Sequence, residues 1–97
     1  MPFGIELDPQ AADDLKRLRA FERAAVLDAI DRILSMRPTQ VGRSRIKRLR
    51  GLNSPQYRLR VDQCRVFYDV IDDAVYVLRI LAKQDVDEYL REMGYEA

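Results

Sequence analysis

The sequence predicts an α+β domain in which a helix hairpin packs on one face of a small, mostly antiparallel sheet of four strands. Two segments with apolar residues at helical spacing follow a short first strand, and three segments with alternating side chains come after them. A short acidic helix ends the chain, so the predicted order is β-α-α-β-β-β-α. With 97 residues, 47% of them hydrophobic, the chain is long enough for one core, and residues 1–97 are predicted to form a single domain.

The first half of the chain is predicted to hold one strand and two helices. Residues 3–7 alternate apolar and other side chains, as a strand does. Asp8 and Pro9 follow as an N-cap and a first-turn proline, which begins a helix over residues 9–19. Its apolar stripe leaves Asp13, Asp14 and their neighbours 16 and 17 facing solvent. The second helix is predicted from residue 21 or 22 to residue 36, before an Arg-Pro pair that disfavours helix.

The second half is predicted to begin with loops over residues 39–44 and 51–55 and to continue as a hairpin of residues 57–62 and 64–71. If Asp62 and Gln63 form the turn, Arg60 lies opposite Arg65. This register puts the apolar side chains on one face, namely Tyr57, Leu59, Val61, Cys64, Val66 and Tyr68. Residues 74–81 form a last strand that is apolar on both faces. The face away from the helix hairpin therefore needs the C-terminal helix, predicted over residues 85–93, or a partner.

The charge of the chain is strongly segregated. The formal net charge is only +1, but residues 37–65 carry +8 and the remainder carries −7. Like charges opposite each other destabilise a sheet, so the pair Arg60 and Arg65 indicates an anionic ligand. Arginine outnumbers lysine eight to one in the basic segment, and its planar fork suits phosphate. This distribution favours a nucleic-acid partner.

Several classes of function are excluded by composition. The chain has no histidine and a single cysteine, Cys64, so histidine acid–base chemistry is excluded and neither a metal site nor any other cofactor is predicted. Cys64 falls on the apolar face and is expected to be an inert core thiol, and Tyr57 and Tyr68 are expected in the core. The sequence shows no signal-peptide pattern and no apolar run long enough to span a membrane, so a cytoplasmic location is expected.

Four short motifs give the chain a family resemblance. They are KRLRG at residues 47–51, YRLRV at 57–61, RVFYDV at 65–70 and VLRI at 77–80. Together with the element order, they resemble the RelE/ParE toxin superfamily of bacterial type II toxin–antitoxin systems over nearly the whole chain. The pattern looks more like the RelE branch than the gyrase-poisoning ParE branch.

The resemblance implies a bacterial cytoplasmic toxin that enters the ribosomal A site and cuts mRNA without a metal ion. In that reaction a 2′-hydroxyl attacks its own 3′-phosphate. The implied partners are ribosome-bound mRNA and rRNA, and a RelB-like antitoxin that brings an acidic amphipathic helix or strand and forms a hetero-oligomer with the toxin. No membrane partner is implied.

The resemblance also assigns roles to individual residues. Arg58 and Arg60 match positions that hold substrate phosphates, and Arg65 matches the arginine that stabilises the transition state. Lys83 matches a second basic position past the last strand and is a candidate general base. Tyr89 is a candidate proton donor.

The segment AKQDVDEY at residues 82–89 departs from the family pattern. Ala82 stands where members of the family have histidine, and Asp87 stands where they have tyrosine. Two alternatives stay open. One is a gyrase poison on the same fold, and the other, suggested by this altered segment, is a degenerate toxin that only binds its antitoxin. A further basic set is expected to track phosphates along the RNA, made up of Arg43, Arg45, Lys47, Arg48 and Arg50.

Overall fold

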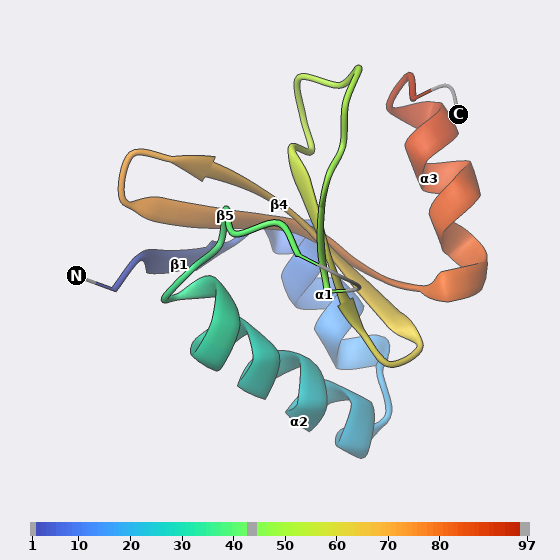
Figure 1. The fold of residues 1–97 in the computed structure, drawn as a ribbon. Coiled ribbons are helices and arrows are strands. Elements are labelled where there is room, and N and C mark those ends of the chain that lie inside the picture. Colours follow the sequence, from blue (N-terminus) through green and yellow to red (C-terminus); the bar gives the residue numbers. More distant parts are fainter. Residues whose placement is uncertain (1, 43–44, 96–97) are drawn as a thin grey trace.

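The computed structural model describes residues 2–42 and 45–95 and has the predicted α+β class. Helices pack against both faces of one sheet (Figure 1). In chain order the elements are β1 (Gly4–Leu7), α1 (Pro9–Arg17), α2 (Ala20–Ala29), a π-helical turn (Ile30–Leu34), β2 (Ile46–Arg48), β3 (Tyr57–Val61), β4 (Cys64–Ile71), β5 (Ala74–Ala82), a 3₁₀ turn (Lys83–Asp85) and α3 (Val86–Glu92).

The sheet has five strands in the order β1-β5-β4-β3-β2, and only β1 pairs in parallel, with β5. The prediction of four strands was therefore wrong by one. Residues 46–48, for which no strand was predicted, form β2 and pair antiparallel with β3. Ile46 is the one apolar residue of β2 and is buried in the core. That single anchor in a run of basic residues is too short a pattern to indicate a strand.

The predicted hairpin register is confirmed residue by residue. Arg60 lies opposite Arg65, Leu59 opposite Val66 and Val61 opposite Cys64. Asp62 adopts a φ of 52°, a left-handed conformation that aspartate tolerates better than most residues. All six apolar side chains predicted for one face of this hairpin lie in or against the main core. The arginines therefore project from the other face.

Helices α1 and α2 cover the apolar face. The Asp8 side chain accepts a hydrogen bond from the backbone N–H of Gln10 at 2.8 Å and caps α1. Arg23 on α2 donates to the carbonyl oxygens of Leu15 at 2.9 Å and Leu18 at 2.7 Å, which ties the two helices together. The second helix changes to π-helical geometry at Ile30, so it is not the continuous α-helix predicted to residue 36.

Helix α3 covers part of the opposite face, as the apolar character of β5 required. Tyr89 and Leu90 of α3 pack on Phe67 of β4 and Leu81 of β5, together with Leu49. In this second, smaller core Phe67 is the cross-strand partner of Arg58 and Leu81 is that of Arg65, so the core lies on the side of the sheet that the arginines occupy.

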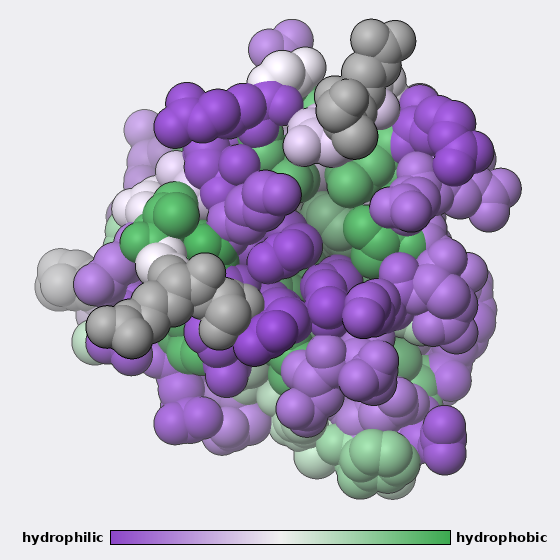
Figure 2. Space-filling view, turned by 45° about the vertical axis from the view of Figure 1, so that its right-hand side comes forward, coloured by the Kyte–Doolittle hydropathy of each residue, from purple (hydrophilic) through white to green (hydrophobic). Residues whose placement is uncertain are grey.

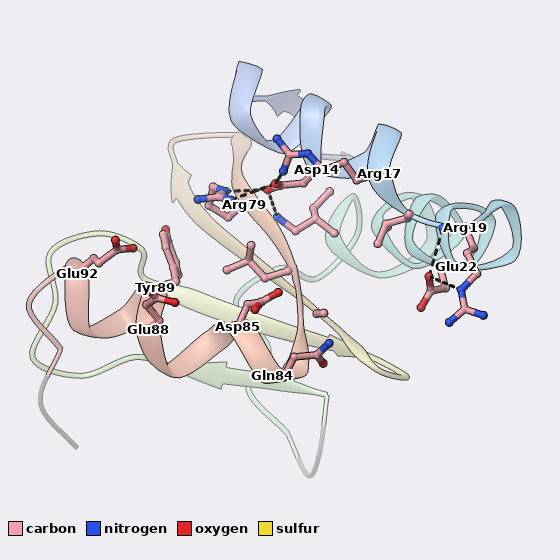
Figure 3. Close-up of a pocket in the computed structure, with 14 residues that line it drawn as sticks. Asp14, Arg17, Arg19, Glu22, Arg79, Gln84, Asp85, Glu88, Tyr89 and Glu92 are labelled. Carbon is pink, nitrogen blue, oxygen red and sulfur yellow. Dashed lines mark hydrogen bonds and ion pairs between the residues drawn. The ribbon is translucent and has the colours of Figure 1, made fainter.

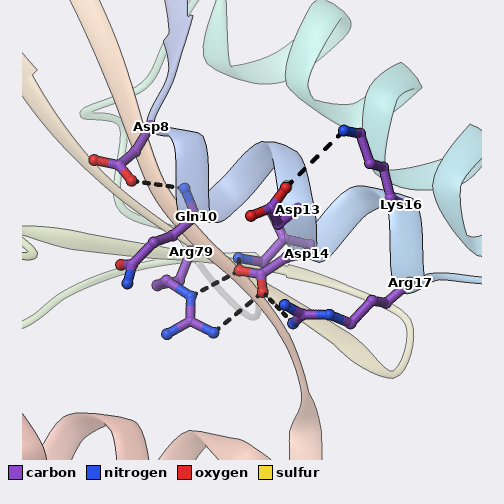
Figure 4. Close-up of polar contacts among 8 residues, drawn as sticks. Asp8, Gln10, Asp13, Asp14, Lys16, Arg17 and Arg79 are labelled. Carbon is purple, nitrogen blue, oxygen red and sulfur yellow. Dashed lines mark hydrogen bonds and ion pairs between the residues drawn. The ribbon is translucent and has the colours of Figure 1, made fainter.

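One prediction on α1 was wrong in an informative way. Asp14 was expected to face solvent, yet only 4% of it is exposed. Its carboxylate accepts from Arg79 Nε at 2.8 Å and from the backbone N–H of Ile80 at 2.9 Å (Figure 4). β1 pairs with β5 only as far as Val77, so Asp14 satisfies a donor on a β5 edge that no strand covers.

Candidate functional site

Four basic side chains share one face of the β2–β3–β4 strands, and we call them the cationic face. Lys47 of β2 is the cross-strand partner of Arg58 of β3, and Arg60 is the partner of Arg65 of β4. No carboxylate in the described part of the chain lies within 4.0 Å of any of the four charged groups. Figure 2 shows the side of the molecule that carries α3, where hydrophilic residues cover most of the surface and hydrophobic residues are visible between them.

Arg58 is the most unusual member of the cationic face. It is half-buried, and its Nε atom is fully buried with no hydrogen-bond partner among residues 2–42 and 45–95. Burial lowers the pKa of its guanidinium, and the positive charges of Arg65 and Arg60 lower that pKa further. A buried donor without an acceptor is costly, so an anion that approached Arg58 would satisfy a group that the protein leaves open.

Arg65 is held in place by backbone oxygens. Its Nη1 atom donates to the carbonyl oxygens of Asp62 at 2.8 Å and Cys64 at 3.0 Å, both at the hairpin turn. Burial lowers its pKa, and so does the charge of Arg60 across the strand pair. Neutral acceptors fix the guanidinium without neutralising it, so its charge is available to a ligand.

The predicted phosphate-binding residues do not all join this face. Arg45 and Arg50 are exposed, and the Arg60 backbone N–H donates to the Arg45 oxygen at 2.8 Å, which brings Arg45 beside this face. Arg48 lies on the opposite face, where its guanidinium stands 5.1 Å from the Tyr57 ring centroid. Arg43 lies outside the described residues.

Lys83 follows β5 directly and lies at the tip of the hairpin. Its backbone N–H donates to the Gln63 oxygen at 2.8 Å, one residue beyond the pair of Cys64 and Ala82. Its side chain is exposed. The structure therefore brings Lys83 to the end of the cationic face where Arg65 is anchored.

Tyr89 is not brought together with the three arginines. It is buried, its ring centroid lies 5.1 Å from that of Phe67, and the Arg79 guanidinium lies 5.6 Å from the ring. Burial raises the pKa of Tyr89 to about 12. Phe67 lies between Arg58 and Arg79 in the cross-strand register, so the tyrosine sits on the far side of Phe67 from Arg58.

An open cleft of about 540 Å³ lies beside α3, and Tyr89 is one of the residues that line it. The cleft lies between the α1–α2 junction, the end of β5 and α3, and none of the cationic-face residues lines it (Figure 3). The sequence did not predict this cleft. The acidic side chains of α3 that border it belong to no recognisable motif, and the helical spacing of α1 predicts that Asp14 faces solvent. Only the β5 edge explains why that aspartate is inside.

The described residues provide neither a cluster of metal ligands nor a helix able to span a membrane. No group of three or more His, Cys, Asp or Glu side chains is placed to hold a metal ion within residues 2–42 and 45–95. None of the helices in that part of the chain has the length and hydropathy that a membrane crossing requires.

A helix pair packs on one side of a mainly antiparallel sheet, and arginines without an ion pair in the described residues lie on the other side. The sequence model of the ParE toxin of the type II toxin–antitoxin system parDE matches residues 5–86. The chain therefore belongs to this toxin family of type II toxin–antitoxin systems, and the RelE/ParE superfamily that its motifs predicted is confirmed. No curated protein sequence matches the chain.

Several solved structures with the same fold carry RelE names. The toxin–antitoxin complex RelBE2 from Mycobacterium tuberculosis is 26% identical, with a TM-score of 0.74 over 84% of this chain and 99% of that one. The RelB–RelE complex from Methanococcus jannaschii is 20% identical, with a TM-score of 0.70 over 87% and 96%. A mutant of the Escherichia coli toxin RelE in the free state is 22% identical, with a TM-score of 0.70 over 97% and 96%.

Proposed function

We propose that the protein is a ribosome-dependent mRNA endonuclease that cleaves without a metal ion and is neutralised by a cognate antitoxin. The observation that carries the proposal is the cationic face, where Arg58, Arg60 and Arg65 share one surface with no carboxylate partner among the described residues. Such a surface fits the negative oxygens of a nucleotide, and it lies opposite the face that α1 and α2 cover.

The reaction would be an attack of the 2′-hydroxyl on the adjacent 3′-phosphate, which gives a 2′,3′-cyclic phosphate and a 5′-hydroxyl. The nucleophile belongs to the RNA, so the protein has to align it, stabilise the pentacoordinate phosphorane and move two protons. Arg58 and Arg60 would hold the phosphate, and Arg65 would stabilise its added charge. Removing one such contact costs about 10²–10³ in rate.

Both proton transfers are assigned to Lys83, which would take the proton of the 2′-hydroxyl as a base and return it to the departing 5′-oxygen as an acid. A guanidinium stays protonated near neutral pH and cannot act as the base. The lysine is at the hairpin tip, beside the anchored Arg65. Lys83→Arg keeps the charge and removes the base, whereas Lys83→Ala removes both. If the arginine variant cleaves like the wild type, Lys83 contributes charge alone.

The experiment that tests the proposal maps RNA 5′ ends after induction of the toxin. We expect new ends within translated messages for the wild type, and none for Arg65→Ala, which should also lose growth arrest while still binding the antitoxin. Arg32→Ala is the matched control, since this exposed arginine pairs with Asp28 on the helical side at 2.9 Å. A fully toxic Arg65→Ala would overturn the catalytic assignment.

The antitoxin is proposed from two observations. The solved complexes named above pair a RelE toxin with RelB, and the cationic face of this chain has no cover in the described residues. An acidic helix or strand of the antitoxin would neutralise that face, and toxin and antitoxin would form a hetero-oligomer.

A gyrase poison is the second candidate, because the family that matches the sequence carries the ParE name. The departures at Ala82 and Asp87 favour it as well, since they remove side chains that the RelE-like chemistry uses. DNA-damage induction without new RNA ends would identify this activity. A complete lack of toxicity in the absence of the antitoxin would instead identify a degenerate binding module.

A further inference from the structure

One wall of the open cleft beside α3 carries carboxylates that have no ion-pair partner in the described residues. Glu88 and Glu92 are four residues apart and share one side of α3, and Asp85 is the residue just before the helix. All three border the cleft (Figure 3). No cation of the described part of the chain lies within 4.0 Å of these three carboxylates. Their negative charge is therefore open to an outside partner.

The charged groups on the other wall are already used within the fold. Arg17 lies 3.3 Å from the buried Asp14, which also binds Arg79. Glu22 accepts from the backbone N–H of Arg19 at 3.3 Å and closes the start of α2. The cleft consequently presents Asp85, Glu88 and Glu92 as carboxylates without an ion pair in the described residues, of which Glu92 contributes to the raised pKa of Arg79.

A second, apolar hollow of about 160 Å³ continues from the cleft, with which it shares Arg19 and Glu22. Ala25, Val61 and Cys64 contribute to its lining. Phe21 stands at its rim with 68% of its surface exposed, the largest exposure among the large hydrophobic residues described. We call the cleft and the hollow together the bipartite groove.

The chemistry of the bipartite groove selects its occupant. Its carboxylates repel phosphate, so this surface does not suit RNA. A peptide with an apolar side chain near a lysine or arginine matches both halves, because exposed aromatic residues beside a hollow are typical anchors of protein interfaces. Groove and cationic face meet at the end of β5, where Leu81 of the cleft is the cross-strand partner of Arg65.

We propose that the bipartite groove binds a basic segment of the cognate antitoxin, with an apolar residue of that segment against Phe21 and its cations along Asp85, Glu88 and Glu92. This inference rests on the antitoxin of the proposed function. An acidic segment on the cationic face and a basic segment in the groove would fix the direction in which the antitoxin crosses the toxin, since opposite charges in two places allow one orientation.

The test measures the affinity of the purified protein for the product of the adjacent antitoxin gene by titration at several salt concentrations. The triple variant Asp85→Asn, Glu88→Gln, Glu92→Gln should bind about 10-fold more weakly and show a smaller loss of affinity with added salt. The control neutralises Asp72, Asp73 and Asp87 to asparagine, three exposed acids that do not line the groove, and should bind like the wild type.

The apolar half is tested separately with Phe21→Ala, which should weaken binding about 10-fold. Leu27→Ala is its control, because Leu27 is on the same helix with 45% exposed and outside the groove. Thermal melts of all variants establish that each is folded.

Three outcomes would overturn the inference. They are unchanged affinity of the groove variants, equal weakening by groove and control variants, and tighter binding after neutralisation, which would indicate an anionic occupant. In each case a tight wild-type complex leaves the proposed function standing. If the wild type itself forms no complex, the antitoxin expected under the proposed function fails, and this inference fails with it.

Discussion

Replacing Arg58 by methionine should make the free protein more stable while it removes a phosphate ligand. The Nε atom of Arg58 is buried without a partner in the described residues, and the guanidinium lies near Arg60 and Arg65. A buried unsatisfied donor costs about 1–3 kcal/mol, and methionine keeps most of the apolar stem. Because Arg58 is only half-buried, we expect the lower end, a gain of about 1 kcal/mol.

The assay is thermal unfolding followed by circular dichroism. For a domain of this size about 1 kcal/mol corresponds to a rise in Tm of about 4–8 °C. The matched control is Arg48→Met. In the wild type, the Arg48 guanidinium donates to the Gln56 oxygen at 2.8 Å and stacks on Tyr57. That variant should lose about 1 kcal/mol.

Whether Arg58→Met raises or lowers the Tm decides the role of Arg58. Added salt should narrow the gap between Arg58→Met and the wild type, because it screens the repulsion from Arg60 and Arg65. If Arg58→Met lowers the Tm as Arg48→Met does, Arg58 stabilises the fold. That result would refute the idea that its Nε donor is left without a partner so that an anion can bind it.

Three further predictions concern buried groups. Asp14→Ala should cost about 3–5 kcal/mol of unfolding free energy by leaving Arg79 unpaired, whereas Asp13→Ala on the exposed side of α1 should change it by less than about 0.5 kcal/mol in chemical denaturation. Burial raises the pKa of the Cys64 thiol, so alkylation of the folded protein should stay slow at pH 8.5, and rapid labelling would contradict its buried position. The Tyr89 pKa is raised to about 12, so the contribution of its neutral hydroxyl to stability is complete below pH 10 and is lost as pH rises through 12. Tyr89→Phe should therefore lose less stability at alkaline pH than the wild type. The variant should also keep RNA cleavage if the tyrosine only packs.

Local patterns predicted much of this molecule. The alternation of residues 57–68 predicted which side chains face the core, and the register that followed from it was correct at Arg60 and Arg65. The Asp-Pro pair predicted the start of α1, and the two-sided apolar pattern of β5 predicted that the face opposite the hairpin helices is covered. These features depend on neighbours a few residues apart, so the sequence carries them directly.

Other features depend on contacts between distant segments. β2 exists because Ile46–Arg48 meet the edge of β3. Asp14 is buried because it accepts from the Ile80 N–H on the β5 edge, 66 residues further along the chain. The bipartite groove likewise joins α2, the hairpin tip and α3, which no local pattern relates.

The sequence by itself determined the α+β class, the strand register and the arginines of the cationic face, because strand periodicity alone assigns each side chain to a face. Only the tertiary structure decided which of the basic residues 45–50 share that face, why Tyr89 stands apart from it, and that free carboxylates line a separate groove. Those outcomes depend on where α3 and β2 come to rest against the sheet, and the energy of that packing is shared among residues far apart in the chain.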